Sequence, residues 1–376
     1  MKNTIMCGAD VHDNSMTTQI AVNKERPETR VFPYTTNGRR NLLKYLKLVA
    51  RKHGADRVVV AYEASSLGFG FCDECTDAGI ECYVLAPTKM PKSEEDRKRK
   101  TDKWDAQKIL EQLRAHILAG NELAKVWIPN LETRDDREVI RMRLALGQKL
   151  TSAKTQVRTL LKRNGMEKPK DVGKAWTVSD RHWLHWLTEP ESKLADGACV
   201  GLASLLRQIA FLEEEIKELD KEIEVLADTE RYKAAAEALV EQLKGVGLLT
   251  AMVFLTEMGD LRRFKNRKKV GAFIGLVPSS NESGEHNDRK GHITRQGPAR
   301  VRKVLCQASW ARIGSDVDES KVHARIVKKN PKKKKIATVA CMRRLGVRMW
   351  HIGMQAQIEA GVYETKQLPC SKQIAV

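Results

Sequence analysis

The N-terminal segment Ile5–Val11, with the sequence IMCGADV, is short and apolar, and two similar segments follow it closely. Thr17–Val22 (TTQIAV) alternates weakly between polar and apolar residues, and Thr29–Tyr34 (TRVFPY) comes after the polar turn Asn23–Pro27. Three short strands at such close spacing are typical of antiparallel hairpins. The sequence therefore predicts that the chain begins with a three-stranded meander.

Beyond this meander, predicted helices and strands alternate. We expect a helix over Gly38–Lys52, a buried strand over Arg57–Ala61 (RVVVA), a helix over Gly68–Ala78 and a buried strand over Glu81–Ala86 (ECYVLA). The order β-β-β-α-β-α-β differs from that of a doubly wound Rossmann domain, which starts with parallel units. It matches the RNase H-like order, so we expect an α/β N-terminal domain of that class.

The composition favours a nucleic-acid partner. The chain has 376 residues, with 67 Lys and Arg against 48 Asp and Glu, and a formal net charge of +19. This length suggests two or three domains, and an apolar share of 41% is enough to form real cores. So large a positive excess indicates a polyanionic partner. A ribosome-associated or merely soluble basic protein is the alternative.

No apolar stretch approaches membrane-spanning length, and the N-terminus lacks the apolar core of a signal peptide. We therefore expect a cytoplasmic protein whose eight cysteines stay reduced. Cys72 and Cys75 form a CxxC with Cys82 nearby, but a zinc site needs a fourth ligand at a matching spacing. We expect Cys72 and Cys75 to share one helix face as small buried residues.

The middle of the chain is predicted to be helical. We expect one helix from Thr101 to about Ala119 and a basic one over Arg134–Arg163, which Asn164-Gly165 can end. A third shows the a/d spacing of a heptad repeat at Leu202, Leu205, Ile209, Leu212, Ile216, Leu219, Ile223 and Leu226. This helix can pack antiparallel on Arg134–Arg163 or pair with another copy of the chain. We expect both, in a coiled-coil helical arm used for assembly into a dimer or tetramer.

The C-terminal part combines a glycine turn with basic residues. Lys244, Gly245 and Gly247 lie in the sequence LKGVG before a predicted helix, Leu248–Met258, and resemble the turn of a helix-hairpin-helix, whose backbone N–H groups can hold a phosphate. The basic cluster over 262–269 strengthens that reading, and the lysine run at 328–335 separately favours phosphate contact over a merely solvated loop. The predicted nucleic-acid-binding residues are Lys244, Gly245, Gly247, Arg262, Arg263, Lys268, Arg289, Lys290, Arg295, Arg300, Arg302, Lys332 and Lys333.

Four acidic residues fall where an RNase H-like domain would bring them together. Asp10 ends the first strand, Glu63 follows the fourth, and Asp102 and Asp105 share one helix face. Each alone is better read as a turn, surface or helix-end acid. Their joint placement predicts a metal site, because close carboxylates repel unless cations neutralise them. Oxygen ligands of this kind suit Mg²⁺ or Mn²⁺. His12 and His286 lie near the candidate sites and receive no role.

The sequence resembles the DEDD transposases of the IS110 group, which also includes Piv-type DNA invertases. The resemblance covers nearly the whole chain and rests on the following motifs: Gly8-Ala9-Asp10-Val11, Tyr62-Glu63-Ala64-Ser65, Lys100-Thr101-Asp102-Lys103-Trp104-Asp105-Ala106, Gly275-Leu276-Val277-Pro278, Ser283-Gly284 and Ile293-Thr294-Arg295-Gln296-Gly297. It implies a RuvC-like DEDD domain over 1–125, a coiled-coil arm over 126–231 and a mostly helical C-terminal transposase domain over 232–376.

The resemblance also implies a reaction. Asp10, Glu63, Asp102 and Asp105 would bind Mg²⁺, and Ser283 would form a covalent phosphoserine link while double-stranded DNA is cut and rejoined. Members of the group use a structured RNA made by the element, which implies a guide RNA and a place at the nucleoid of a bacterium or archaeon. From the residues alone, a flexible Ser/Gly-rich surface loop is the favoured reading of Ser283, and the resemblance reverses that preference.

Two other functions remain open at this point. One is a RuvC-like nuclease or Holliday-junction resolvase, in which metal-activated water attacks the DNA and no covalent adduct forms. The other is a basic nucleic-acid-binding scaffold whose acidic residues are incidental.

Overall fold

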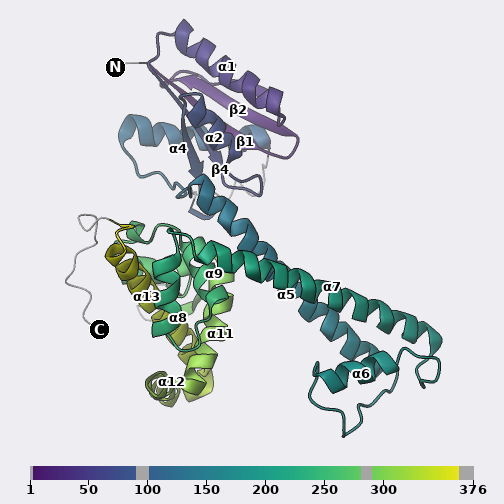
Figure 1. Cartoon of the computed structure of the whole chain (residues 1–376). Helices are drawn as coiled ribbons and strands as arrows, with labels where there is room; N and C mark the ends of the chain where they lie inside the picture. The colour runs from purple at the N-terminus through teal and green to yellow at the C-terminus, as the bar shows by residue number, and fades with distance from the viewer. Residues whose placement is uncertain (1–2, 90–100, 281–289, 364–376) are drawn as a thin grey trace. The chain divides into compact units, whose positions relative to one another are not determined.

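The structure, a computed structural model, describes residues 3–89, 101–280 and 290–363, and the chain divides into two compact units, Met1–Ile128 and Pro129–Val376. The first unit contains a five-stranded sheet (Figure 1). Its strands are β1 (Thr4–Val11), β2 (Ser15–Val22), β3 (Glu28–Pro33), β4 (Arg57–Glu63) and β5 (Glu81–Leu85). They lie in the order β3-β2-β1-β4-β5.

The pairing of the strands agrees with the predicted order of elements. β1, β2 and β3 form an antiparallel meander, and β4 and β5 join the far side of β1 in parallel. Parallel neighbours need crossover connections, which the two helices α1 (Thr36–Lys52) and α2 (Gly70–Asp77) provide. The predicted meander and the two predicted β-α-β units are therefore confirmed.

Each face of the sheet carries its own apolar cluster. Odd-numbered residues of β1, such as Cys7 and Ala9, pack with α1 and α2. Met6 of β1 and Ala61 of β4 pack instead with α4 (Asp102–Ala119) on the opposite face. This alternation follows from the two-residue period of a strand. It decides which strand residues face the N-terminus of α4.

Helix α4 crosses β1 at a position that only glycine can occupy. A Cβ atom at Gly8 would lie 2.4 Å from the backbone oxygen of Ala106 and 2.4 Å from the backbone nitrogen of Leu110. The helix backbone therefore rests directly on the strand. Ile109, Leu110 and Leu113 of α4 are buried on the side of the helix that faces the sheet. Leucine and isoleucine on the underside of α4 supply the apolar contact that holds it there.

The cysteine prediction is confirmed for Cys72 and Cys75. Both are buried on α2 and belong to the cluster beneath the sheet. Burial raises the pKa of the Cys7 thiol, with the nearby Cys75 adding to the effect. Thiols in such surroundings stay protonated and act as small apolar groups.

The second unit begins with two long helices that pack along each other. They are α5 (Leu131–Arg163) and α7 (Asp196–Ala227), joined by a connector that contains α6 (Val178–Trp186). Arg143 pairs with Asp220 and Lys154 pairs with Glu213, so the helices run antiparallel. Of the predicted heptad residues, Leu202, Ile209 and Ile223 are buried, whereas Leu205, Leu212, Ile216, Leu219 and Leu226 are half-buried. The predicted antiparallel packing is confirmed, and the coiled-coil assignment stays a prediction.

Helix α9 (Leu248–Met258) begins and ends where the sequence predicted, and α5, α7, α8 (Lys233–Gln242) and α11 (Ala299–Ser315) pack against it. Residues Ala251–Met258 are all buried, as expected for a helix that is apolar around its whole circumference. The other elements of this part are α10 (Arg267–Ile274), α12 (Val317–Lys329), α13 (Lys335–Glu359) and a hairpin of β6 (Pro278–Ser280) and β7 (Lys290–Ile293). Ile140 and Ile223, at the base of α5 and α7, belong to the same apolar core.

The three expected domains do not coincide with these two units. The structure places residues 129–231 and 232–376 in one unit, so the separation of the arm from the C-terminal domain stays a prediction.

A Gly8→Ala substitution tests the contact between α4 and β1. We expect it to lower the free energy of unfolding by about 3 kcal/mol, because the added methyl group forces two backbones apart. Gly70→Ala is the matched control, since a Cβ there meets no atom within 4 Å. Urea denaturation of the two variants measures the difference. Equal stability of the two would show that α4 does not depend on this close approach.

A Glu213→Gln substitution tests the ion pairs near the connector. Glu213 accepts hydrogen bonds from Arg181 and Lys154, which lower its pKa from 4.5 to about 2. A lowered carboxyl pKa stabilises the fold above pH 4.5, and this contribution is lost as the pH falls toward 2. We expect Glu213→Gln to cost about 1.5 kcal/mol at pH 7 and much less at pH 2. The measurement is thermal unfolding at both pH values. Glu214→Gln, whose carboxylate pairs with Lys217 of the same helix, should change little.

Candidate active site

Asp10 and Glu63 lie at matching positions on two neighbouring parallel strands. The recorded pairing of β1 with β4 ends at Ala9 and Tyr62, and each acid is the next residue along its strand. Asp10 has the same strand parity as Met6, and Glu63 the same parity as Ala61, so both belong to the face that α4 covers. Both side chains are half-buried. The strand order therefore brings these two predicted acids to one edge of the sheet.

Asp102 and Asp105 occupy the first turn of α4. The Thr101 hydroxyl accepts a hydrogen bond from the Trp104 backbone N–H and caps the helix. Acidic residues in a first turn are stabilised by the helix dipole. Lys108, one turn further along, lies 3.9 Å from the carboxylate of Asp105. Because α4 rests on β1 at Gly8, its first turn lies beside the end of that strand.

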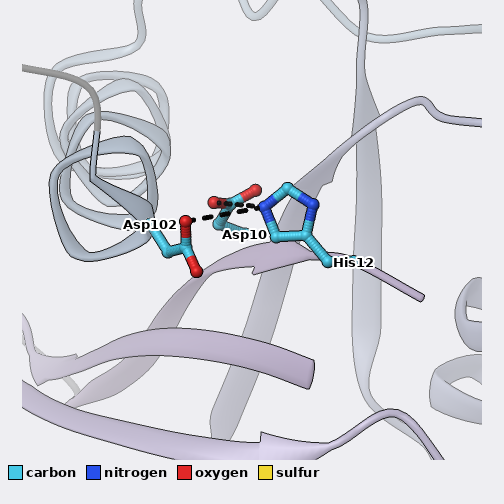
Figure 2. Close-up of side chains that lie close together, drawn as sticks. All are labelled: Asp10, His12 and Asp102. Carbon is cyan, nitrogen blue, oxygen red and sulfur yellow. Dashed lines mark hydrogen bonds and ion pairs between the residues drawn. The ribbon is translucent and has the colours of Figure 1, made fainter. Parts of the chain in front are cut away.

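His12 joins two of these carboxylates. Its Nε2 atom lies 3.1 Å from Oδ2 of Asp10 and 3.8 Å from Oδ1 of Asp102, as Figure 2 shows. One ligand atom from each of Asp10, His12 and Asp102 fits within 4.8 Å of the others. Two carboxylate oxygens and an imidazole nitrogen at this separation form a group that could hold a divalent metal ion. The three residues come from the end of β1 and the start of α4.

The electrostatics at Asp10 favour a cation. Burial raises the pKa of Asp10, and the negative charges of Asp105 and Asp102 raise it further, while the hydrogen bond and charge of His12 oppose the increase. The ionised carboxylate is therefore unfavourable in this position without a positive partner. A bound cation would remove that penalty.

The site opens to solvent. A cavity of about 570 Å³ adjoins it, lined by Val11, His12, Asp13, Asn14, Ser15, Ser65, Ser66, Leu67 and Asp102. The side chains of His12 and Asp102 are 55% and 58% exposed, so a large substrate can reach them. An exposed sheet edge of this kind suits a polymer that does not enter a closed pocket.

Two of the three residues in this cluster were predicted from the sequence. They are Asp10 and Asp102, whereas His12 received no role, and the metal-compatible group does not extend to Glu63 or Asp105 among the described residues. Asp10 and His12 are two residues apart, and that spacing returns to the same side of an extended chain. The pair Asp-x-His at a strand end was therefore the available signal for His12.

The predicted nucleophile Ser283 and the predicted phosphate ligand Arg289 lie outside the described residues. On either side of them in the sequence, β6 and β7 pair in an antiparallel hairpin. The hydroxyl of Ser279 donates to the backbone oxygen of His292 across this hairpin. Lys290 begins β7.

The motifs GLVP (residues 275–278) and ITRQG (residues 293–297) pack against each other through one glycine of each. A Cβ at Gly275 would lie 2.2 Å from the backbone oxygen of Gln296, and one at Gly297 would lie 1.9 Å from that of Phe273. Both glycines have positive φ angles, which side-chain-bearing residues avoid. Arg302 donates from one nitrogen to the backbone oxygens of Ile274, Gln296 and Gly297. The two motifs therefore form a single support at the base of the β6–β7 hairpin.

Several arginines predicted to bind nucleic acid make contacts within the protein. Arg263 donates to the backbone oxygen of Met258 at the end of α9, and burial lowers its pKa to about 10. Arg262 pairs with Asp260 and stacks on the ring of Tyr363. Cations near a helix C-terminus stabilise its free carbonyl groups. These two arginines therefore stabilise the end of α9 and the turn that follows it.

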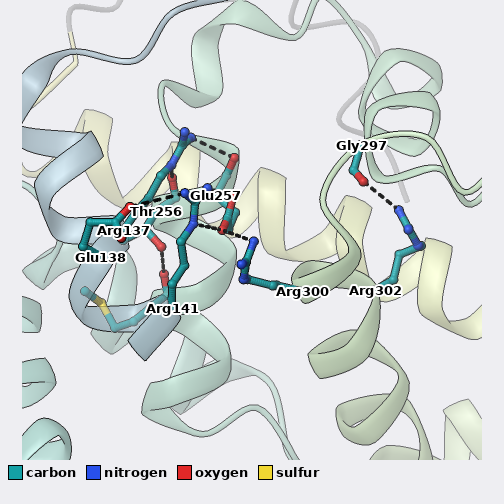
Figure 3. A network of polar contacts seen from close by, with 9 residues as sticks. Arg137, Glu138, Arg141, Thr256, Glu257, Gly297, Arg300 and Arg302 are labelled. Carbon is teal, nitrogen blue, oxygen red and sulfur yellow. Dashed lines mark hydrogen bonds and ion pairs between the residues drawn. The ribbon is translucent and has the colours of Figure 1, made fainter. Parts of the chain in front are cut away.

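Glu257 is the centre of a related network, shown in Figure 3. Its carboxylate, with 6% of the side chain exposed, accepts hydrogen bonds from Arg141 of α5 and lies 3.8 Å from the guanidinium of Arg300. Arg137 of α5 donates to the backbone oxygens of Thr256 and Glu257. The base of α5 is thus joined to α9 by charged hydrogen bonds as well as by apolar packing.

The other predicted basic residues are exposed. This group consists of Lys244, Lys268, Arg295, Lys332 and Lys333. Lys244 lies in the turn between α8 and α9, with Gly245 and Gly247, and its backbone oxygen accepts from the buried Arg312. Arg312 therefore fixes the backbone of this turn to α11.

Within residues 3–89, 101–280 and 290–363, no helix is both long enough and apolar enough to cross a bilayer.

The comparisons with known proteins agree on one family. Residues 7–165 match the family model for DEDD transposases of IS110, described as "Transposase", and residues 237–324 match the model described as "Transposase IS116/IS110/IS902 family". The first match contains the candidate metal cluster, and the second contains the β6–β7 hairpin with Ser283.

Named relatives are similar over most of the chain. The protein y4qE of Sinorhizobium fredii is 30% identical over 257 residues, 68% of this chain and 58% of that protein. The "Transposase for insertion sequence element IS1533" of Leptospira borgpetersenii is 26% identical over 315 residues, 82% of this chain and 86% of that protein. The "Transposase for insertion sequence element IS1111A" of Coxiella burnetii is 25% identical over 239 residues, 62% and 60% of the two chains. The matching alignment therefore spans less than two thirds of y4qE and of the IS1111A transposase. With both family models matched in chain order, these relatives show that the chain belongs to the IS116/IS110/IS902 family of transposases.

Proposed function

We propose that this protein is a transposase that cuts and rejoins double-stranded DNA by metal-assisted phosphoryl transfer. The observation that carries the proposal is the Asp10, His12 and Asp102 cluster at the exposed end of an RNase H-like sheet. Family membership and the net charge of +19 support a DNA substrate.

The donor set fits a hard divalent cation. Asp10 and Asp102 offer carboxylate oxygens, and we propose that Glu63 and Asp105, on the same side of the sheet, complete the ligand set. When bound, Mg²⁺ or Mn²⁺ would polarise a phosphate oxygen as a Lewis acid and offset negative charge in the transition state. The four carboxylates bind and orient the ion, and α4 fixes the relative positions of the acids at its N-terminus.

Ser283 is the proposed nucleophile. Its hydroxyl oxygen attacks the phosphorus of a DNA strand and forms an O–P bond, while the bond from phosphorus to the leaving strand oxygen breaks. The serine gives up its proton, and the leaving oxygen takes one up to become a hydroxyl end. Attack by another strand's hydroxyl on the phosphoserine reverses these steps and rejoins the DNA. The GLVP and ITRQG support, held by Arg302, anchors β6 and β7, and Ser283 falls between these two strands in the sequence.

We also propose that the protein acts as a homo-oligomer with a structured guide RNA. Self-association is supported by the helix α7, where Leu212, Ile216 and Leu219 remain half-buried and Phe211 is 64% exposed. Large apolar side chains left open on an otherwise charged helix favour a further helical partner. The guide RNA rests on the family resemblance and on the basic charge. The exposed residues Lys244, Lys268, Arg295, Lys332 and Lys333 are the proposed phosphate contacts.

A Ser283→Ala substitution tests the covalent step. With suicide DNA substrates that trap the intermediate, we expect the unmodified protein to form protein–DNA adducts and Ser283→Ala to form none, while DNA binding is retained. Ser279→Ala is the control, because its hydroxyl is engaged with the hairpin backbone. Cleavage without adducts in the unmodified protein would instead identify a nuclease that uses water. Adducts that survive in Ser283→Ala would refute the nucleophile assignment.

An Asp10→Asn substitution separates metal binding from folding. We expect the affinity for Mn²⁺, measured by calorimetry, to fall at least about tenfold, because a negative ligand is lost. The metal-free variant should unfold at an equal or higher temperature, since the raised pKa of Asp10 means that its charge is unfavourable in the fold. Asp13→Asn is the control, as Asp13 is exposed and outside the cluster. Unchanged Mn²⁺ affinity in Asp10→Asn would contradict the metal assignment.

A further inference from the structure

A second cavity lies where α5 ends, and its lining contains none of the candidate active-site residues. It has a volume of about 390 Å³ and is formed by the last turns of α5, the connector that follows and α6. Trp176, Trp183, Leu161 and Met166 supply apolar and aromatic walls, and Arg158 and Lys162 add positive charge. The lining also includes Lys168 and the acids Glu167 and Asp180, so the cavity combines flat aromatic surface with a net positive charge.

Trp176 is held in a conformation that its residue type avoids. Its φ angle is 66°, in the left-handed region. The Trp176 backbone N–H donates to the buried carboxylate of Asp180 at 2.6 Å, and its backbone oxygen accepts from Arg181 at 3.3 Å. Asp180 also pairs with Lys168 of the connector. Both backbone groups of Trp176 are thus fixed, and strain that the surroundings maintain is characteristic of functional positions.

The indole N–H of Trp176 has no hydrogen-bond acceptor among the described residues, and its Nε1 atom is buried. The ammonium group of Lys154 lies 5.0 Å from the centre of the ring system. A buried N–H without a partner is unfavourable, so a ligand that supplied an acceptor there would gain by it.

The chain around the cavity is basic. Residues 158–176 include six Lys or Arg and two Asp or Glu, a formal charge of +4. Arg158 and Lys162 are exposed and form no ion pair with any residue in the described part of the chain. Exposed cations beside an aromatic wall are the arrangement by which proteins bind single-stranded nucleic acid, with bases stacked on rings and phosphates near Lys and Arg.

We propose that this cavity binds one unpaired base of a single-stranded nucleic-acid segment. Trp176 and Trp183 contact the base, and Arg158 and Lys162 contact the adjoining phosphates. The charge favours this occupant over a peptide, because the rim attracts a polyanion and the walls accept a flat ring. Duplex DNA keeps its bases stacked and paired, so it cannot fill the cavity without unpairing. The site does not depend on the proposed metal or serine chemistry.

The first test is a binding measurement on the full chain. Fluorescence anisotropy with a labelled 12-nucleotide oligo-dT, an oligo-U and a 12-base-pair duplex compares the unmodified protein with Trp183→Leu and Trp176→Phe. Trp186→Leu is the matched control, since Trp186 is on the same helix, is exposed and does not line the cavity.

Trp183→Leu should weaken single-strand binding about 5- to 100-fold, the range for loss of one stacked base, and leave duplex binding unchanged. Trp176→Phe keeps a ring but loses the N–H donor, so we expect a smaller loss. The two single-strand probes show whether the 2′-hydroxyl contributes, and the proposal holds for either preference. Equal losses in Trp183→Leu and Trp186→Leu, or equal loss for duplex and single strand, would overturn it.

The second test needs no substitution and so does not depend on a variant that folds. A single-stranded oligonucleotide with 4-thiouridine at its centre is crosslinked to the unmodified protein, and the attached peptide is identified by mass spectrometry. We expect attachment within residues 158–186. Attachment only at other regions would refute the proposal.

A change of oligomeric state in Trp183→Leu without loss of single-strand binding would show instead that the cavity receives a second copy of the chain. Asp102→Ala should leave these results unaltered, so failure here is distinguishable from failure of the proposed transposase chemistry.

Discussion

The contact between the backbone of α4 and strand β1 at Gly8 determines the geometry of the candidate active site. Without a side chain at Gly8, the helix lies directly on the strand, and its first turn reaches the end of β1. Asp102 then comes close enough to Asp10 for His12 to contact both. The unfavourable burial of Asp10 follows from the same approach. One missing methyl group thus brings together candidate metal ligands that are about ninety residues apart in the sequence.

The fold of the first unit could be predicted because strand period and element order are local properties of the sequence. Asp10 and Glu63 were placed correctly on neighbouring strand ends for the same reason. His12 was not, because its contact with Asp102 depends on how closely α4 approaches β1. The hairpin of β6 and β7 was also missed, since its strands are three and four residues long and give no readable alternation. Short elements of this kind are fixed by tertiary contacts such as those of Gly275 and Gly297.

Composition does not distinguish basic residues that bond within the protein from basic residues that remain exposed. Arg302, Arg263 and Arg137 donate mainly to backbone oxygens at helix ends and motif boundaries, and they stabilise the second unit. Sequence reasoning assigned the first two to nucleic acid, because it cannot locate the carbonyl groups that accept their hydrogen bonds. The lysines, with one compact charge on a flexible chain, are the more exposed group and match the role of phosphate contacts better.

The long helices α5 and α7 are continuous with the core around α9, since Ile140 and Ile223 pack within it and Arg137 and Arg141 bond to the end of α9. Close-packed interiors are stiff, so this root does not act as a free hinge. From Leu144, the outermost α5 residue of that core, to Arg163 the helix extends about 28 Å. A force applied by a ligand at the far end would therefore act as a torque on α9. The helix pair is therefore a stiff arm anchored in the hydrophobic core.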